Sequence, residues 1–273
     1  MTRDVLVVIG VGGMGQAIAR RLGPGKTVVL GDNDAATLQR AAACLTAEGH
    51  LVELRNVDVT SAASVRDLAS TARELGAVSQ VAHTAGLSPA QAPTAAILAV
   101  DLLGVAHVLD EFATVIAPGG AGVVIASMAG HLYPPLPADQ QHVLAHTPAG
   151  ELLSLPFLSP ERLTDPGLAY AIAKQANHLR VVAAHSEWGS RGARINSISP
   201  GIISTPMGQR ELNSPLGDGM RAMVDSSSAS RLGTPDDIAA AAAFLLGPES
   251  SFVTGTDLLI DGGVTAALRS AAS

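Results

Sequence analysis

The chain has 273 residues and a hydrophobic share of 47%, which suits one large α/β domain with a sizeable core or two small domains. Its formal net charge of −7 argues against a general nucleic-acid binder or a protein that docks on anionic membranes, so we expect neither partner. The single cysteine, Cys44, excludes an internal disulfide and suits a reducing cytoplasm, and every apolar run is shorter than the roughly 18 residues that cross a membrane.

The first predicted element is a buried strand over Asp4–Ile9, an apolar run of the kind found in parallel sheets, with no signal peptide expected ahead of it. A glycine-rich turn and a helix over Gln16–Leu22 follow. A strand, a glycine-rich turn and a helix are the context in which a dinucleotide pyrophosphate rests on the amides of a helix N-terminus. The turn residues predicted to contact the cofactor are Gly10, Gly12, Gly13, Met14 and Gly15.

The second predicted strand, Thr27–Leu30, leads to Asp32. An acid at this place accepts hydrogen bonds from both ribose hydroxyls of an adenosine and repels a 2′-phosphate. No Arg or Lys lies within the glycine turn or directly after Asp32, so the sequence favours NAD over NADP. Asn33 is predicted beside Asp32 in the cofactor site, although Asn33 and Asp34 could equally cap the next helix.

Strands and helices then alternate at intervals of about 25 residues, which is typical of a doubly wound sheet with right-handed crossovers. A long helical region is predicted over Ala95–Ala117, before a fifth strand over Gly122–Ala126. That strand delivers Ser127 at its carboxyl end, where ligands bind in such sheets. The earlier elements of the alternation are the helices Ala35–Ala47 and Ser61–Leu75 and the strands Leu51–Leu54 and Ser79–His83.

The proline-rich stretch His131–Pro166 is predicted to be an inserted segment with a short helix over Asp139–His146. His142 and His146 are four residues apart, as in some metal sites, but no third ligand has comparable spacing. A solvated helix face is therefore favoured, and no metal is predicted. An apolar cluster in the insert must bury against the domain, a substrate or another subunit. Its members are Leu152, Leu153, Leu155, Phe157 and Leu158.

A helix over Leu168–Glu187 carries Tyr170 and Lys174, whose spacing places the two side chains one turn apart on one helix face. A cation beside a phenol favours the phenolate and lowers the pKa of the tyrosine. Such a tyrosine can exchange a proton with an alcohol or a carbonyl near neutral pH. The alternative is an ordinary helix that has a Tyr and a Lys on its flank.

A sixth strand is predicted over Arg194–Ile198, and a last strand over Asp257–Ile260. Between them, the polar stretch Glu211–Ser230 is interpreted as a mobile flap, and Thr234–Leu246 as a capped helix. We find no internal repeat and no linker. The prediction is therefore one Rossmann-type domain over residues 1–273, with a parallel sheet of about seven strands flanked by helices.

Taken together, these motifs resemble the short-chain dehydrogenase/reductase family, over essentially the whole chain from residue 4 to about 264. The segment Gly255–Gly263 also looks like the closing strand of that family. The insert resembles one in bacterial hydroxysteroid dehydrogenase/carbonyl reductases. The motifs that carry the resemblance are Gly10–Gly15, Asp32, Asp58-Val59, Ala85-Gly86, Ser127–Gly130, Tyr170-x-x-x-Lys174 and Pro200-Gly201.

The resemblance implies an NAD-dependent oxidoreductase, a homodimer or homotetramer, that interconverts a small-molecule secondary alcohol and a ketone. Tyr170 would be the general acid/base, Lys174 would hold the nicotinamide ribose, and Ser127 would hydrogen-bond the substrate oxygen. In oxidation, Tyr170 would take the hydroxyl proton while a hydride passes to the nicotinamide. Tyr170 and Lys174 also count among the implied cofactor contacts, together with Asp58, Val59, Ala85, Gly86, Pro200, Gly201, Ile203 and Thr205.

The sequence departs from the family pattern in four places. The glycine turn is one residue shorter and follows Ile9 in place of Thr, and His83-Thr84 replaces the usual pair of asparagines. The asparagine that often bends a helix behind the lysine, so that a main-chain carbonyl binds a water, falls on Asp101, whose catalytic role stays open. Ser127 and Tyr170 lie 43 positions apart, whereas the family usually has about a dozen residues between them.

Two other functions remain open at this stage. The altered turn and Asp101 would suit an NAD(H)-binding sensor or structural protein with little turnover, and the cofactor could be NADP in a carbonyl reductase. The apolar insert and the flap favour a bulky apolar alcohol, such as a hydroxysteroid, as substrate. The same residues could instead form an oligomer contact.

Overall fold

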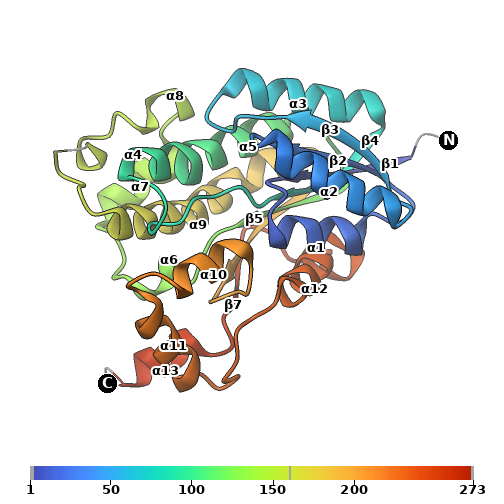
Figure 1. Cartoon of the computed structure of the whole chain (residues 1–273). Coiled ribbons are helices and arrows are strands. Elements are labelled where there is room, and N and C mark those ends of the chain that lie inside the picture. Colours follow the sequence, from blue (N-terminus) through green and yellow to red (C-terminus); the bar gives the residue numbers. More distant parts are fainter. Residues whose placement is uncertain (1–2, 160, 272–273) are drawn as a thin grey trace.

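The computed structural model describes residues 3–159 and 161–271, and its centre is a seven-stranded parallel sheet (Figure 1). The strands lie in the order β3-β2-β1-β4-β5-β6-β7, so the chain reverses its direction of winding between β1 and β4. Ligands of such sheets bind at this switch point, outside the carboxyl ends of the strands. The predicted doubly wound sheet is confirmed. Its strands are β1 (Asp4–Ile9), β2 (Thr27–Asp32), β3 (Leu51–Asn56), β4 (Ala77–His83), β5 (Ile116–Ile125), β6 (Arg194–Pro200) and β7 (Asp257–Ile260).

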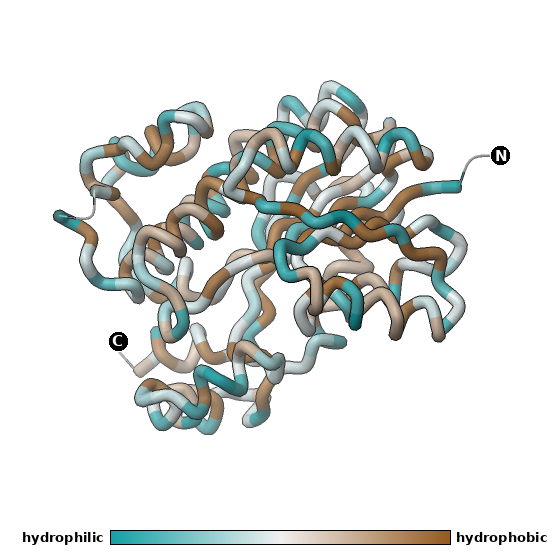
Figure 2. Tube along the Cα trace, turned by 45° about the horizontal axis from the view of Figure 1, so that its top comes forward, coloured by the Kyte–Doolittle hydropathy of each residue, from teal (hydrophilic) through white to brown (hydrophobic). Residues whose placement is uncertain are grey.

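Helices cover both faces of the sheet, because successive side chains of each buried strand point to opposite sides. In β1, Val5 and Val7 face the core under α3, α5 and α9, whereas Leu6 and Val8 face α1, α2 and α12. Figure 2 shows the result, since the central strands are mostly brown and the teal residues gather on outer turns. These helices are α1 (Gly13–Leu22), α2 (Ala35–Ala47), α3 (Ala62–Leu75), α5 (Gly104–Ala113), α9 (Pro166–Ser190) and α12 (Pro235–Leu246).

The long helical region predicted over Ala95–Ala117 is confirmed from Ala95 to Ala113, but its C-terminal end is wrong. The structure has α4 (Thr94–Ile97), then a π-helical segment over Leu98–Leu103, then α5, which ends at Ala113. β5 begins at Ile116, because Ile116 pairs with Val78 before a register shift in the ladder. The turn-forming residues Pro118–Gly120 thus interrupt a strand without ending it, as in a bulge, whereas in the sequence they look like the boundary before it.

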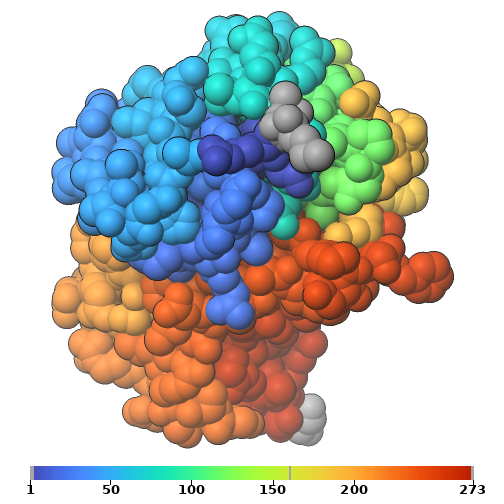
Figure 3. Space-filling model, turned by 90° about the vertical axis from the view of Figure 1, so that its right-hand side faces the viewer, coloured from blue at the N-terminus to red at the C-terminus, as the bar shows by residue number. Residues whose placement is uncertain are grey.

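The C-terminal third of the chain adds helices below the sheet in Figure 1 and forms the lower part of the face shown in Figure 3. The polar stretch that we interpreted as a flap, Glu211–Ser230, contains α11 and the last two residues of α10. They follow the carboxyl end of β6, so they lie on the side of the sheet where the ligands of such folds bind. The elements are α10 (Pro206–Leu212), α11 (Gly217–Ser226), α13 (Val264–Ala271) and a 3-10 turn over Pro248–Ser250.

The insert consists of short helices that pack on the domain itself. Leu152 and Leu158 are buried in one cluster with Leu144 and with residues of α4 and α9, while Leu153 stays 38% exposed. Arg180 of α9 holds the insert by donating to the carbonyls of Leu144 (3.1 Å) and Thr147 (3.0 Å). Within the described residues no helix is long and apolar enough to cross a membrane. The insert elements are α6 (Ala129–Leu132), α7 (Ala138–His146), α8 (Ala149–Leu152) and a 3-10 turn over Pro156–Leu158.

Candidate active site

A cavity of about 460 Å³ opens over the glycine turn between β1 and α1. Gly12 caps α1 without offering a side chain to the amides of the first turn, and a Cβ added at Gly12 would meet nothing within 4 Å. Gly10 needs its glycine, because its φ is +88° and a Cβ would collide with the backbone of Ala85. A Cβ on Gly15 would collide with the carbonyl of Gly10. Free helix-terminal amides beside open space fit a dinucleotide pyrophosphate.

Asp32 ties the end of β2 to this turn. Its Oδ2 accepts the amide of Val11 at 2.8 Å, and its Oδ1 accepts the amide of Asp34 at 3.0 Å. Asp34 is the residue that caps α2, since its carboxylate accepts the amide of Thr37 at 2.8 Å. Asn33 contributes its carbonyl, which accepts the side-chain amide of Asn56 at 3.1 Å. The carboxylate of Asp32 therefore stands beside the glycine turn, although Asp32 is not among the described residues that line the cavity, and its contact with a ribose stays a prediction.

Asp58 and Val59 lie at the next turn along the same edge of the sheet. Asp58 Oδ1 accepts the amide (2.9 Å) and the hydroxyl (2.8 Å) of Thr60, so this carboxylate shapes its own turn. The carbonyl of Val59 lies 3.0 Å from Nδ1 of His107, and its side chain is buried. Neither residue is among the described residues that line the cavity over the glycine turn.

A second, smaller cavity of about 110 Å³ collects most of the remaining predicted residues from distant parts of the chain. It shares Met14 and Thr205 with the glycine-turn cavity, and it shares Ser127 and Tyr170 with a third cavity of about 520 Å³. The three cavities thus follow one another from the glycine turn to the reacting side chains. The predicted residues that line the second cavity are Met14, Ala85, Gly86, Asp101, Ser127, Tyr170, Lys174, Pro200, Gly201, Ile203 and Thr205.

The second cavity holds Tyr170, the residue that the sequence predicts as the proton-transfer group. The ammonium Nζ of Lys174 lies 5.3 Å from the centroid of the Tyr170 ring. Burial raises the pKa of Tyr170, and the cation of Lys174 and a hydrogen bond to Ser127 lower it only in part. Asp101 and Glu211 add to the increase in that pKa. The free protein therefore holds the tyrosine as a neutral phenol, which differs from the sequence-based expectation that Lys174 lowers the pKa overall.

Asp101 lies in the π-helical segment and faces Lys174. Its Oδ1 accepts the amide of Leu87 at 2.7 Å, and its Oδ2 lies 3.4 Å from Lys174 Nζ, which donates to the carbonyl of Ile125 at 3.3 Å. Burial favours the neutral form of both groups and raises the pKa of Asp101. For Lys174 the attraction of Asp101 and Tyr170 outweighs burial, so the pKa of the amine is raised and it stays an ammonium.

His83 and Thr84 connect β4 to the glycine turn. The hydroxyl of Thr84 donates to the carbonyl of Gly10, and the amides of Thr84 (2.7 Å) and Ala85 (2.9 Å) donate to the carbonyl of Ile9. His83 is fully buried, and neither of its ring nitrogens has a hydrogen-bond partner. Burial and the charge of Lys174 lower the pKa of His83 to about 3, so its imidazole is neutral. His83-Thr84, which replaces the usual pair of asparagines, thus still links the end of β4 to the end of β1.

Four charged residues of these cavities were missed from the sequence. One of them, Asp165, lines the third cavity and caps α9. Arg40 and Arg210 line the cavity over the glycine turn, and Glu211 lines both the second and the third cavity. Burial raises the pKa of Glu211, and a hydrogen bond from Ser88 opposes that increase. Arg40 is the sixth residue of α2, the helix that follows Asp32, so the helix periodicity after Asp32 could have indicated it. Arg210 and Glu211 are brought in only by the tertiary position of α10.

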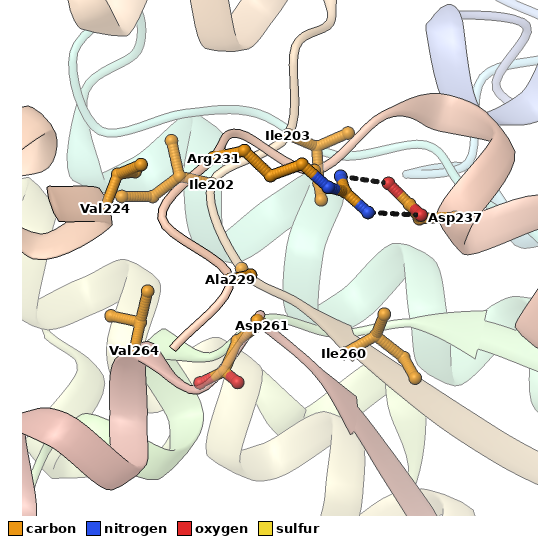
Figure 4. A pocket seen from close by; sticks show the side chains of 12 residues that line it. Ile202, Ile203, Val224, Ala229, Arg231, Asp237, Ile260, Asp261 and Val264 are labelled. Atoms are coloured by element: carbon orange, nitrogen blue, oxygen red, sulfur yellow. Dashed lines mark hydrogen bonds and ion pairs between the residues drawn. The ribbon is translucent and has the colours of Figure 1, made fainter. Parts of the chain in front are cut away.

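A separate cavity of about 160 Å³ is lined in part by the segment that runs from Gly201 to Ile203 (Figure 4). The figure shows Arg231 and Asp237 directed toward each other, with contacts of 2.8 and 3.0 Å. Asp237 also forms a capping box with Thr234 at the start of α12. Arg231 and Asp237 are therefore paired with each other and hold the 230s loop. Asp261, the other charged residue of this cavity, accepts the amides of Gly263 and Thr265.

Two known protein families each match about half of the chain. Residues 3–137 match the family described as short chain dehydrogenase, and residues 137–265 match the family described as Enoyl-(Acyl carrier protein) reductase. The chain is 44% identical over 269 residues to "Short-chain dehydrogenase/reductase bsc3" of Alternaria brassicicola, with 98% of each chain covered. The chain belongs to the short-chain dehydrogenase/reductase family. It is thus an oxidoreductase of alcohol or ketone substrates that uses a nicotinamide dinucleotide.

Other relatives of this short-chain dehydrogenase/reductase agree with that assignment. It is 29% identical over 241 residues to the 3-alpha-hydroxysteroid dehydrogenase/carbonyl reductase of Comamonas testosteroni, covering 82% of this chain and 91% of that protein. A solved short-chain dehydrogenase/reductase from Serratia marcescens superimposes with a TM-score of 0.74 at 22% identity, over 96% of this chain and 98% of the other. The structural likeness supports the fold, and the predicted family resemblance is confirmed.

Proposed function

We propose that the protein is an NAD-dependent oxidoreductase that interconverts a secondary alcohol and a ketone, with Tyr170 as general acid/base. The observation that carries the proposal is the shared lining of the cavities. Ser127 and Tyr170 line both the second and the third cavity, and the second cavity continues into the one over the glycine turn. A substrate oxygen in the third cavity can thus reach the two hydroxyls beside the place that suits a nicotinamide.

Each side chain has a distinct task in this proposal. The hydroxyl of Ser127 holds the substrate oxygen, and Tyr170 removes the alcohol proton in oxidation or returns it in reduction. Lys174 remains an ammonium, paired with Asp101, and its charge favours the phenolate when the proton is exchanged. A bound nicotinamide supplies the hydride acceptor or donor. Ala85, Gly86, Pro200, Gly201, Ile203 and Thr205 form the walls that would orient it.

The carboxylate of Asp32 supports NAD as the cofactor, while Arg40 in the same region would favour a 2′-phosphate. Replacing Asp32 by Ala should therefore lower the ratio of NAD to NADP affinity about 10-fold or more, because charge-assisted hydrogen bonds to the ribose are lost. Fluorescence titration of both reduced cofactors measures this ratio. Asp34→Ala is the matched control, since Asp34 carries the same charge two residues away but caps α2. An unchanged ratio in Asp32→Ala would favour the NADP-dependent carbonyl reductase.

The third cavity supports a bulky, largely apolar substrate, such as a hydroxysteroid. The two ends of the insert contribute Tyr133 and Pro166 to its wall, and Met128, Ile202 and Met220 add apolar surface. The insert's middle packs on α4 and α9, so it contributes through its ends and not through the buried leucines. Asp165 and Glu211 are the charged exceptions. Asp165 already caps α9, whereas Glu211 suits a substrate that carries a second hydrogen-bond donor away from the reacting carbon.

The decisive test mixes protein and NAD with steroid, terpenoid and polyol secondary alcohols and follows the absorbance of the reduced cofactor. Turnover that prefers the bulky alcohols supports the proposal. Tight NADH binding without turnover over alcohols and ketones would instead favour a sensor.

We also propose that residues 1–273 form one domain and that the protein is a homodimer or homotetramer. A cytoplasmic location is proposed as well, in keeping with the lone Cys44. The exposed Phe244 and Phe252 support self-association, which sedimentation measures.

Glu211 should also set the pH range of the reaction. Its negative charge raises the pKa of Tyr170, so Glu211→Gln should lower that pKa. Oxidation needs the basic form of Tyr170, and the rising limb of kcat against pH should therefore move to lower pH in the variant. The pH profile of alcohol oxidation is the measurement. Glu151→Gln in the insert removes the same charge far from the cavities and should leave the profile in place; a limb that moves to higher pH in Glu211→Gln would contradict the expectation.

A further inference from the structure

Two histidines and an aspartate from three separate elements form one cluster. His131 belongs to α6, His178 to α9 and Asp257 to β7. His131 Nε2 lies 2.7 Å from Asp257 Oδ2. His178 Nε2 lies 3.4 Å from Asp257 Oδ1 and 2.8 Å from the hydroxyl of Ser199, a contact that a bound metal would replace. The two imidazole rings stand beside each other, with their centroids 4.8 Å apart. Each of the three residues can place a ligand atom within 4.8 Å of the other two.

The chemistry of these donors is that of a transition-metal site. Two imidazole nitrogens and one carboxylate are a ligand set that zinc and similar dications accept, with a fourth position left to solvent. Ligand atoms around tetrahedral zinc stand about 3.3 Å apart, given bonds of roughly 2.0–2.2 Å. The contacts of 2.7 and 3.4 Å involve different oxygens of Asp257, and the three ligand atoms lie within 4.8 Å of one another. Side-chain shifts of about 1.5 Å or less would therefore bring the three atoms to the spacing of a zinc site.

The surroundings also suit a metal. Asp257 Oδ1 accepts hydrogen bonds from the hydroxyls of Ser197 (2.6 Å) and Ser199 (3.0 Å), which fix the carboxylate as outer-shell groups do in metal sites. The side chains of His131 and His178 are 25% and 19% exposed, which leaves a path for an ion from solvent.

We propose that His131, His178 and Asp257 bind a divalent transition metal of the zinc class, at a site distinct from the cavities of the reaction. The metal would join α6, α9 and β7. α6 follows directly on Ser127, and His178 lies one turn after Lys174 on α9. The bound ion would therefore hold the two segments that present the serine and the lysine, without contacting substrate or cofactor.

The test is a titration of untagged, chelator-treated protein with Co²⁺, followed by visible absorbance. We expect one equivalent of Co²⁺ to give the intense bands of four-coordinate cobalt, and Zn²⁺ to displace them. Asp257→Asn and His178→Ala should each weaken binding about 100-fold or more, since even outer-shell changes cost 10–100-fold. Far-UV circular dichroism checks that each variant is folded.

His142 and His146 provide the matched control within the chain. Their rings are also 4.8 Å apart, but no third ligand joins them among the described residues. The double variant His142→Ala/His146→Ala should bind Co²⁺ as the wild type does. Equal binding by wild type and Asp257→Asn, or loss of binding in the control, would overturn the proposal.

A measurement on the wild type alone covers the case in which a variant does not fold. Diethyl pyrocarbonate modifies accessible imidazoles, and mass spectrometry locates the modified residues. One equivalent of Zn²⁺ should slow the modification of His131 and His178 at least 10-fold and leave His142 and His146 unchanged, if Zn²⁺ is present at roughly ten times its dissociation constant or above. Equal rates with and without Zn²⁺ at all four histidines would also overturn the proposal.

Discussion

Replacing Tyr170 by Phe is expected to lower kcat for alcohol oxidation about 10³-fold or more, because the only change is the loss of the hydroxyl that exchanges the proton. The ring of Tyr170 packs against the apolar cluster that joins α9 to the insert, and Phe preserves that contact. Affinity for NADH should therefore change by no more than a few fold. Steady-state kinetics with NAD and the best alcohol of the panel, together with NADH titration, measure both quantities.

Two comparisons make the Tyr170 experiment specific. Ser127→Ala removes the hydroxyl that hydrogen-bonds Tyr170, and it should lower kcat less than Tyr170→Phe, about 10²-fold. Tyr133→Phe removes a phenol from the wall of the third cavity, and it should leave kcat within a few fold. A Tyr170→Phe enzyme as active as the wild type would contradict the mechanism. A parallel loss of NADH binding would indicate a structural defect instead.

The sheet could be predicted because each of its strands is marked by local sequence. Asp4–Ile9 is an apolar run that ends at a glycine turn, and the predicted strand has the bounds of β1. The errors lie where glycine and proline residues can either end a strand or interrupt it. Pro118–Gly120 look like a boundary, yet β5 passes through them, because tertiary pairing with β4 compensates for the break. The π-helical segment around Asp101 likewise leaves no periodicity that differs from an ordinary helix.

The gathering of Ser127, Tyr170 and Lys174 at one cavity could be predicted because these residues end strands or share a helix face. Ser127 follows β5 and Tyr170 lies on α9, so the sheet topology brings them to one cavity across the insert. Glu211 could not be placed, since a carboxylate in a polar stretch gives no sign of which cavity its helix covers. The direction in which the pKa of Tyr170 shifts could not be predicted either, because it depends on burial, whereas the spacing shows only the neighbouring Lys174.

The cluster of His131, His178 and Asp257 also could not be predicted from the sequence. The search for metal ligands in the sequence found His142 and His146, because helical spacing is visible along the chain. The structural group joins three elements, and its members are separated by tens of residues. Local periodicity thus indicated the pair that lacks a third ligand, while the group with three ligands needs the fold to be known.

Replacing Lys174 by Met should cost about 3–5 kcal/mol of the free energy of unfolding as well as the activity, because it leaves the buried carboxylate of Asp101 without its partner. Lys174 and Asp101 are 3% and 0% exposed, so water does not replace the lost contact. Urea denaturation at neutral pH measures the loss. The deficit should shrink at acidic pH, where protonation of Asp101, whose pKa burial already raises, removes the unpaired charge.

The double variant Asp101→Asn/Lys174→Met separates stability from catalysis. Asn at position 101 can still accept the amide of Leu87, as Asp101 Oδ1 does, and it carries no charge into the core. We therefore expect the double variant to regain about 2 kcal/mol or more over Lys174→Met, with activity still absent because no ammonium faces Tyr170. Additive losses in the two single variants would mean that the ion pair contributes nothing. Recovery of turnover would mean that the charge of Lys174 is not needed to favour the phenolate.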